Sequence, residues 1–289
     1  MTWCGSTATK IGGLMDFDLR TTDSAFDFVQ DLLGMTGQQF IHEYMVECEG
    51  DYERLWERHY NQLKHIDASR IRIWAFHITG SLDHCRSIKQ EGLRNLHYAL
   101  STNSAMSRMF RKYGLLFDVV QKTMEFEQTI YDVDYSKYRG RCNLYGRDEQ
   151  LSSIAYRLSQ DYCVNGFMCH DDPTSYGFDV HIRPEFIVDL VNMFPQLSEL
   201  DLEWRRQSTS YKVHFFTYLH QLEGFNFELD NYRDPPYEVW NDLETNDKVI
   251  KWMLGRAIAR SFDELSEIYL YVKADSFVPP EQISDYERI

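Results

Sequence analysis

The spacing of hydrophobic positions changes along the chain, and each spacing predicts a different element. Residues 71–78 carry apolar side chains on both pleat faces, which is typical of a strand buried inside a sheet. His77 stands at the carboxyl end of this predicted strand. Residues 81–93 follow with apolar groups at helical spacing and reach Gly92, where a helix would stop. The pattern therefore predicts a strand, a turn and a short helix, with an imidazole aimed at a strand end.

Helices are predicted before this strand, and a mixture of elements after it. Apolar residues between Thr22 and about Lys64 recur at intervals of three and four, with breaks near Gly34, Gly37 and the acidic run 47–51. Further helices are expected over residues 105–113, 150–162 and 249–258. Further strands are expected over residues 94–101, 164–170, 178–182, 211–218 and 267–272. The remaining segments predict an irregular arm over 1–20, a long covering loop with short strands over 115–147, and a rigid extended exit over 277–283.

Length and composition limit the size of the hydrophobic core, and the net charge limits the kinds of molecule that the protein can bind. With 289 residues, 43% of them hydrophobic, the chain can bury one large core or a core with a small appended domain. The 45 acidic and 30 basic residues give a net charge of -15, which argues against sequence-independent binding to nucleic-acid phosphates or to an anionic membrane. We divide the chain into a helical N-terminal subdomain, residues 1–68, and a second domain, residues 69–289.

Cysteine usage and the first residues predict a cytoplasmic location. The six cysteines include no CxxC pair and no regular spacing, so reduced thiols are expected rather than a disulfide framework or a zinc site. Residues 1–6 have neither the basic nor the apolar region of a secretion signal, and no apolar run approaches the length of a membrane span. We therefore expect no membrane contact. We also expect no metal, because the group Cys163, Cys169 and His170 fits no common ligand spacing.

A glutamate opens the last strongly alternating segment. In residues 267–272, Glu267 shares one pleat face with Tyr269 and Tyr271, while the aliphatic residues share the other face. Residues 278–283, Val-Pro-Pro-Glu-Gln-Ile, follow shortly afterwards. Two further signatures stand earlier in the chain. His77-Ile78-Thr79-Gly80 precedes an I-x-x-x-G-L run at 88–93, and the predicted strand 94–101 carries a tyrosine that is followed about a dozen residues later by a phenylalanine, with a serine between them; these are Tyr98, Ser104 and Phe110.

Together, these signatures resemble the ADP-ribosyltransferase superfamily of the diphtheria-toxin and PARP type, and the DNA-targeting ADP-ribosyltransferase toxins of bacterial toxin-antitoxin pairs. The resemblance covers roughly residues 71–110 and 248–285. It departs from the family at Ile78, where PARP-like members have glycine, and at Phe110, which replaces a tyrosine. It implies an α+β fold with a mixed, split β-sheet core, in which the Glu267 strand runs beside the His77 strand.

The resemblance also implies a chemistry that uses NAD as a substrate. Cleavage of the nicotinamide-ribose bond passes through an oxocarbenium-like state, which the Glu267 carboxylate would stabilise. His77 would hydrogen-bond a ribose hydroxyl, while the backbone of Ile78 would hold the nicotinamide amide. Tyr98 and Phe110 would sandwich the nicotinamide ring. The catalytic set implied is His77, Tyr98 and Glu267, and the NAD-binding set is His77, Ile78, Thr79, Tyr98, Ser104 and Phe110.

Several alternatives stay open. Taken singly, His77, Tyr98 and Phe110 are core residues more often than ligands, so only their joint order supports the site. Glu185 is a competing glutamate, because residues 185–188, Glu-Phe-Ile-Val, resemble the run around the PARP-type catalytic glutamate. Glu267 is preferred because the proline before Glu185 indicates a strand exit.

The sequence leads to a functional expectation with two rivals. The expectation is a cytoplasmic mono-ADP-ribosyltransferase, such as a bacterial toxin or a phage-defence effector, with an antitoxin protein as a candidate partner. The acceptor would be a protein or a nucleic acid, and the basic and aromatic residues 137–141 are either a single-strand contact or, more simply, a solvated loop. The rivals are an RNA 2'-phosphotransferase-like enzyme, which the acidic balance disfavours, and a catalytically silent binding module with the same fold.

Overall fold

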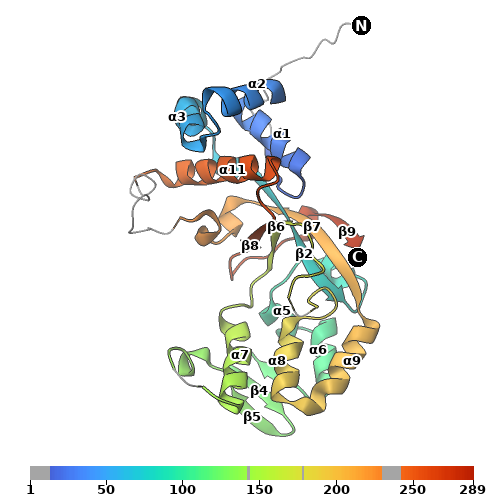
Figure 1. Cartoon of the computed structure of the whole chain (residues 1–289). Coiled ribbons are helices and arrows are strands. Elements are labelled where there is room, and N and C mark those ends of the chain that lie inside the picture. The colour runs from blue at the N-terminus through green and yellow to red at the C-terminus, as the bar shows by residue number, and fades with distance from the viewer. Residues whose placement is uncertain (1–13, 142–143, 178, 230–241) are drawn as a thin grey trace. The chain divides into compact units, whose positions relative to one another are not determined.

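The computed structural model describes residues 14–141, 144–177, 179–229 and 242–289. A six-stranded sheet follows the order β8-β6-β2-β7-β9, and β1 pairs in parallel with β2 (Figure 1). Its strands are β1 (Asp16–Phe17), β2 (Arg72–Ser81), β6 (Asn165–His170), β7 (Thr209–Thr217), β8 (Glu267–Tyr271) and β9 (Ile283–Arg288). A separate antiparallel sheet contains β3 (Leu116–Asp118), β4 (Thr123–Phe126) and β5 (Thr129–Asp132). Helices and sheets of this kind confirm the α+β class.

The chain divides into two compact units. Unit 1 contains the described residues up to Ala75 together with Phe167–Asp171 and Phe216–Leu270, and unit 2 contains the remaining described residues. The predicted helical subdomain, residues 1–68, thus falls within unit 1, which also takes residues from the middle and the last third of the chain. A subdomain that is contiguous in sequence is only one part of this compact unit.

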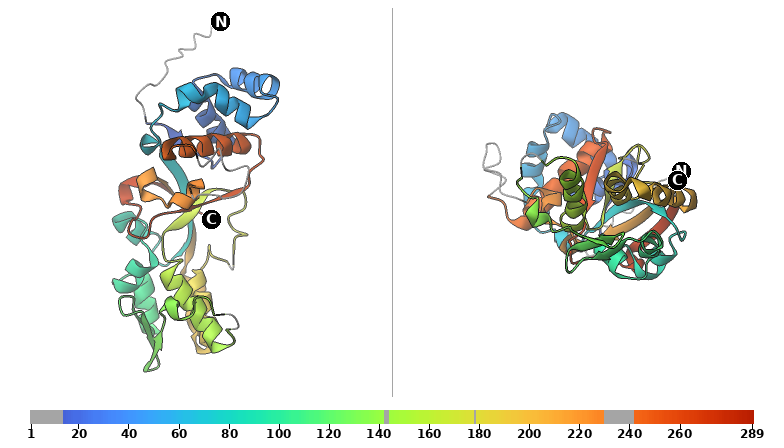
Figure 2. Two further views of the ribbon diagram at one scale, coloured as in Figure 1. Left: turned by 90° about the vertical axis from the view of Figure 1, so that its left-hand side faces the viewer. Right: turned by 90° about the horizontal axis from the view of Figure 1, so that it is seen from below.

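Helices dominate unit 1. The elements are α1 (Thr22–Leu33), α2 (Gly37–His42), the π-helix η1 (Glu43–Glu47), α3 (Tyr52–Leu63) and α11 (Thr245–Ser261). Thr21 caps α1 in a capping box with Ser24, and Gly34 ends that helix with a left-handed φ of 65°. The helix periodicity predicted for this region and for residues 249–258 is confirmed. Figure 2 shows the N-terminal helices, in blue, lying along α11, in orange-red.

Aromatic side chains fill the core of unit 1. Phe17 of β1 packs edge-on against Phe28 of α1, with ring centroids 5.0 Å apart, and lies 6.0 Å from Trp252 of α11. Phe17 is fully buried, so the side chain of this β1 residue packs between α1 and α11 and stabilises their contact. This part of residues 1–20 was predicted to be irregular, and that prediction is wrong for residues 16–17. The parallel pairing of Asp16 with Arg72 orders it.

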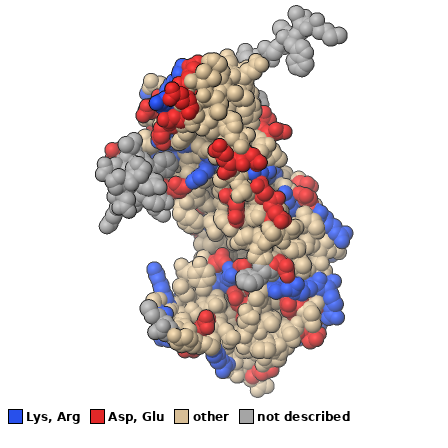
Figure 3. Space-filling view, viewed as in Figure 1, with Lys and Arg blue, Asp and Glu red and all other residues tan. Residues whose placement is uncertain are grey.

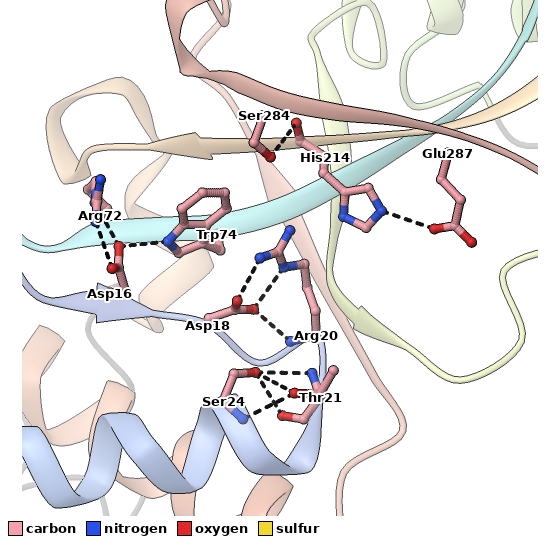
Figure 4. A network of polar contacts seen from close by, with 10 residues as sticks. All are labelled: Asp16, Asp18, Arg20, Thr21, Ser24, Arg72, Trp74, His214, Ser284 and Glu287. Atoms are coloured by element: carbon pink, nitrogen blue, oxygen red, sulfur yellow. Dashed lines mark hydrogen bonds and ion pairs between the residues drawn. The ribbon is translucent and has the colours of Figure 1, made fainter.

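Charged groups flank the start of β2 within unit 1. Asp16 accepts hydrogen bonds from the Arg72 guanidinium at 2.6 Å and from the Trp74 indole at 2.7 Å, as Figure 4 shows. Asp18 pairs with Arg20 at 2.6 Å, and the Arg20 guanidinium lies 4.5 Å from the Trp74 ring centre. These contacts pin the segment before α1 to the first residues of β2.

Unit 2 contains several short helices and the three-stranded sheet. The helices are α4 (Arg86–Glu91), α5 (Leu96–Ser101), α6 (Ala105–Lys112), α7 (Arg147–Ser159), α8 (Glu185–Met193) and α9 (Ser198–Gln207). Their apolar faces share one core with β4, to which the following residues contribute: Phe110, Met124, Ile154, Ile187, Leu190 and Trp204. The predicted helices over 81–93, 105–113 and 150–162 are confirmed, as are the short strands within 115–147.

The last strand closes one edge of the six-stranded sheet. β9 pairs antiparallel with β7, from Tyr211 opposite Arg288, and the register shifts between His214 and Phe215. His214 lies 3.1 Å from the Glu287 carboxylate, and the Ser284 hydroxyl donates to the His214 carbonyl at 3.3 Å (Figure 4). The sequence predicted β7 but not its edge partner β9.

Three predicted elements differ in the structure. Residues 94–101 were predicted to be a strand, but residues 96–101 form helix α5 because the Asn95 side chain accepts the Tyr98 backbone N-H and caps it. Residues 179–182 form a turn rather than a strand, since Asp179 has a φ of 62° and its carbonyl accepts the N-H of Ile182; residue 178 lies outside the described ranges. The predicted extended exit over 277–283 is interrupted by the 3-10 helix η7 (Pro280–Gln282) before β9 begins.

The described surface is acidic and mixed. On the face in Figure 3, acidic side chains gather in several groups in the upper half, and basic side chains gather at the right side of the lower half. The described cysteines Cys48, Cys85, Cys163 and Cys169 are not joined in disulfides, whereas the other two cysteines lie outside the described residues. In the described ranges, every helix is too short or too polar to cross a membrane.

Candidate active site

His77 lies inside strand β2 and not at its end. Four residues follow it in the strand, up to Ser81, so the prediction of a strand-end histidine is wrong. The strand continues because Gly80 has no side chain and passes closely against the Ile182 backbone in unit 2. His77 is therefore held by a sheet strand rather than presented from a flexible loop.

The hydrogen bond of His77 determines its protonation pattern. Its Nδ1 lies 2.7 Å from the backbone carbonyl oxygen of Asn165, and a carbonyl only accepts, so Nδ1 carries the hydrogen. Burial among surrounding protein atoms lowers the pKa of His77 below its usual value, although part of its surface remains accessible. Its Nε2 has no hydrogen-bond partner among the residues that the structure describes. His77 is therefore a neutral imidazole whose Nε2 can accept a hydrogen bond from a ligand hydroxyl.

The two residues after His77 keep different amounts of exposed surface. The Ile78 side chain is buried, whereas Thr79 remains half-buried and presents a hydroxyl. The role predicted for Ile78 uses its backbone groups and not its side chain, so burial of the side chain does not bear on it. The Ile78 and Thr79 contacts to NAD stay predictions.

Tyr98 stands on helix α5 and not on a strand. Its hydroxyl donates to Glu91 at 3.1 Å, and the Arg94 guanidinium lies 4.9 Å from its ring centre. One face of the ring is thus taken by a cation, which leaves the ring edge and the other face for further contacts. The predicted stacking of Tyr98 against nicotinamide would have to use that other face.

Ser104 and Phe110 have structural roles in unit 2. The Ser104 hydroxyl donates to the Ala99 carbonyl at 2.6 Å and accepts the Ser107 backbone N-H at 3.0 Å, which caps α6. Phe110 is 1% exposed, and its ring lies 5.7 Å from that of Phe117 in the core. The ring of Phe110 is therefore inaccessible to a ligand in this conformation.

Glu267 begins strand β8 in unit 1, as predicted. Its side chain is 36% exposed, and its Oε1 lies 3.8 Å from Nε2 of His170 on β6. This distance is too long for a hydrogen bond, so the interaction is electrostatic and depends on the charge of His170. Tyr269 lies on the same pleat face as Glu267, and its ring centre is 5.2 Å from that of Phe167. The pairing of Glu267 with His170 could not be predicted from the sequence, because it depends on which strands are neighbours.

The order of strands corrects one expectation taken from the resemblance. The sheet places β6 between β8 and β2, so the Glu267 strand does not run beside the His77 strand. A strand was predicted over residues 164–170, but its place in the sheet was not predicted. A strand's position is set by side-chain packing from distant segments, which a local pattern does not contain.

The competing glutamate lies in a helix. Glu185 is the first residue of α8, and its carboxylate lies 2.8 Å from the Arg157 guanidinium. Arg157 also contacts Asp161 and Asp189, and desolvation by burial raises the pKa of Asp189. Glu185 is thus part of an ion-pair network that joins α7 to α8, a structural role that its strand-like sequence did not predict.

Cys163, Cys169 and His170 are the residues considered above as metal ligands. Burial raises the pKa of the Cys169 thiol to about 11, which disfavours the thiolate that a metal would need. Within the described ranges, acidic, histidine and cysteine side chains do not gather in threes as a metal centre requires.

Comparison with known proteins adds no relative. No protein-family model matches the chain, and neither a curated protein nor a solved structure matches it. Functional reasoning therefore starts from the contacts of the candidate residues themselves.

Proposed function

We propose that this protein is an NAD-dependent mono-ADP-ribosyltransferase that modifies a macromolecular acceptor. The observation that carries the proposal is the state of His77, a desolvated, neutral imidazole whose Nδ1 is bound to a backbone carbonyl and whose Nε2 is left as an acceptor. A ribose hydroxyl of NAD can donate to this nitrogen. The His-Ile-Thr-Gly motif that supplies His77 is also the first signature of the resemblance.

Glu267 is the proposed catalytic carboxylate. It is partly exposed at the head of a strand whose same-face neighbours are tyrosines, so a substrate can reach it. A carboxylate near the ribose would stabilise the positive charge that develops as the nicotinamide nitrogen leaves with the bonding electron pair. An acceptor nucleophile would then form the new bond to ribose C1' and lose its proton to solvent or a base.

The test measures both products of this reaction. Purified full-length protein is incubated with NAD labelled in its adenylate part and with cell extract separated into protein, DNA and RNA. Released nicotinamide and label in one macromolecular fraction are expected. Neither product in any fraction would reject the transferase.

Two matched glutamine variants test which of the two candidate glutamates is catalytic. Glu267→Gln keeps the size and hydrogen bonding of the side chain but removes its charge, so transfer should fall by roughly two to three decades, about 3 to 4 kcal/mol of transition-state stabilisation. NAD binding should change little. Glu185→Gln should retain most of the activity, because Glu185 is engaged by Arg157. Loss of transfer in Glu185→Gln with full activity in Glu267→Gln would assign catalysis to Glu185 instead.

A binding module without catalysis is the second candidate, favoured by two observations. Phe110 is sealed in the core, and the Tyr98 ring already has Arg94 on one face, so the aromatic sandwich is incomplete as it stands. Such a protein would bind NAD or ADP-ribose without releasing nicotinamide. The RNA 2'-phosphotransferase-like alternative needs basic residues for the 2'-phosphate, against the net charge of -15.

The biological setting proposed is the cytoplasm, with a toxin or phage-defence role and an antitoxin as a candidate partner. A toxic role predicts that expression of the wild-type chain slows bacterial growth more than expression of Glu267→Gln. Equal growth of the two strains at equal protein level would reject the toxic role. It would not reject the transferase activity, which the label assay tests separately.

A further inference from the structure

Unit 2 contains a cavity that neither His77 nor Glu267 lines. It has a volume of about 340 Å³ and lies against α5, the three-stranded sheet and the end of α7. Cavities from about 300 Å³ upward hold small organic ligands in proteins. Its lining combines aromatic rings with two cations, of which the following carry the argument: His97, Phe117, Lys122, Tyr135, Arg139 and Tyr162.

The aromatic part of the lining is preorganised. The His97 and Tyr162 rings are stacked, with centroids 4.0 Å apart and planes 5° from parallel. His97 Nε2 lies 2.6 Å from the Leu158 carbonyl oxygen and must donate to it, so Nδ1 carries the lone pair. Among the described residues Nδ1 has no partner. The wall thus offers a flat surface and, at its edge, one hydrogen-bond acceptor.

The charged side chains of the lining differ in whether a protein group already binds them. Lys122 lies 3.0 Å from the Asp134 carboxylate, and this hydrogen bond lowers the pKa of Asp134. Asp118 accepts the backbone N-H groups of a tight turn at 3.0 and 2.9 Å. Arg139 is exposed and has no side-chain partner among the described residues. The cation open to a ligand is therefore the Arg139 guanidinium, which binds phosphate oxygens in bidentate fashion.

We propose that this cavity binds a nucleoside monophosphate unit. The base lies beside the His97 ring and donates an N-H to its Nδ1 in the plane of that ring, it packs against the other aromatic side chains of the lining, and its phosphate contacts Arg139 at the exposed side. A planar ring system that has an edge donor and an attached anion matches all three features, whereas inorganic phosphate or a bare aromatic compound matches only one. This inference goes beyond the proposed transferase and does not depend on it.

The nucleotide has two potential sources. It is either a free mononucleotide or one nucleotide of a single strand. Arg141, two residues beyond Arg139, is also exposed, and we expect it to contact the next phosphate of a strand. Lys137 is less available, because it forms an ion pair with Asp132. The two sources therefore differ in their need for Arg141.

Isothermal titration of the full chain tests the ligand class. The four common nucleoside monophosphates, their nucleosides and inorganic phosphate are titrated separately at low salt. At least one monophosphate should bind with a Kd below about 1 mM, its nucleoside about tenfold more weakly, and inorganic phosphate without detectable heat. Absence of binding by all four monophosphates, or equal binding of nucleoside and nucleotide, would overturn the proposal.

Substitutions at the lining locate the site. Arg139→Gln should lower nucleotide affinity about tenfold and leave nucleoside affinity unchanged, while Tyr135→Leu should weaken both. Arg206→Gln, which removes an exposed arginine of α9 that is absent from the lining, is the charge-matched control and should change neither. Wild-type affinity in both Arg139→Gln and Tyr135→Leu would place the binding elsewhere and reject the cavity.

A short single-stranded oligonucleotide identifies the source. Binding at least tenfold tighter than the mononucleotide, reduced by Arg141→Gln, assigns the cavity to a nucleotide of a strand. Equal affinity for the two ligands, unaffected by Arg141→Gln, assigns it to a free nucleotide. Either result supports the nucleotide chemistry, whereas oligonucleotide binding that survives Arg139→Gln unchanged contradicts it.

Discussion

Gly80 is the position where a single methyl group tests the fold most sharply. An alanine Cβ placed there would lie 1.9 Å from the Ile182 carbonyl oxygen and 2.4 Å from its carbonyl carbon, whereas real contacts of this kind do not fall below 3.0 Å. The backbones would have to separate by about 1.1 Å. The Ser208 hydroxyl already donates to the same oxygen at 2.8 Å, so Ile182 cannot move without losing that bond.

The magnitude follows from three contributions to the free energy of unfolding. Overpacking against a rigid backbone costs about 1 to 3 kcal/mol. A lost hydrogen bond at a buried carbonyl adds about 1 kcal/mol. The reduced freedom of alanine in the unfolded chain returns about 0.4 to 1 kcal/mol. Gly80→Ala should therefore lower the free energy of unfolding by about 2 kcal/mol, within a range of about 1 to 4 kcal/mol.

Urea unfolding followed by far-UV circular dichroism measures this change. Gly114→Ala is the matched control, because Gly114 has a φ of 76° and nothing lies within 4 Å of its added Cβ. That variant has backbone strain without a clash and should lose about 1 kcal/mol. A Gly80→Ala midpoint equal to that of the wild type, or a loss smaller than in Gly114→Ala, would refute the close approach of β2 to Ile182.

Three further changes test the buried charges. Burial lowers the pKa of His77 in the folded state. Below about pH 6.5 the unfolded chain therefore binds a proton at His77 that the folded chain does not bind. The free energy of unfolding should then fall with decreasing pH by up to about 1.4 kcal/mol per pH unit. His77→Gln should remove that slope in urea unfolding at several pH values, whereas the exposed control His65→Gln should keep it. Asp189→Asn should stabilise the protein slightly at pH 7 and not at pH 3, since burial raises the pKa of Asp189 and disfavours its charged form; a destabilised variant at pH 7 would contradict this reasoning. Arg260→Leu should lower the unfolding free energy by about 3 kcal/mol, because the buried guanidinium donates to two backbone carbonyls and a carboxylate. Arg260→Lys has fewer donors and should restore only part of this stability. Full stability in Arg260→Lys would show that the positive charge alone is required.

Most elements that depend on local spacing could be predicted from the sequence. The helices α1, α3, α6, α7 and α11 and the strands β2, β6, β7 and β8 lie where periodicity placed them, because each buries one apolar face whose repeat is visible within a few residues. The stops at Gly34 and Gly92 were equally readable, since a left-handed φ favours glycine. The face of β8 shared by Glu267 and its tyrosines followed from simple alternation.

The local pattern failed where two structures share the same apolar spacing. Leu96 and Leu100 lie on one face of a strand and, four residues apart, also on one face of a helix. The side-chain cap from Asn95 decided in favour of the helix. Glu185 was misread for a similar reason, because an apolar run after proline suits a strand exit as well as a helix start.

Contacts between residues far apart in the chain depend on how the whole chain packs. Strand order put β6 between β8 and β2, so Glu267 gained His170 as its neighbour. Packing buried Phe110, and a backbone carbonyl from residue 165 oriented His77. These contacts join segments many tens of residues apart, and their energies depend on the packing of the whole core, which no local repeat of hydrophobic and polar residues encodes.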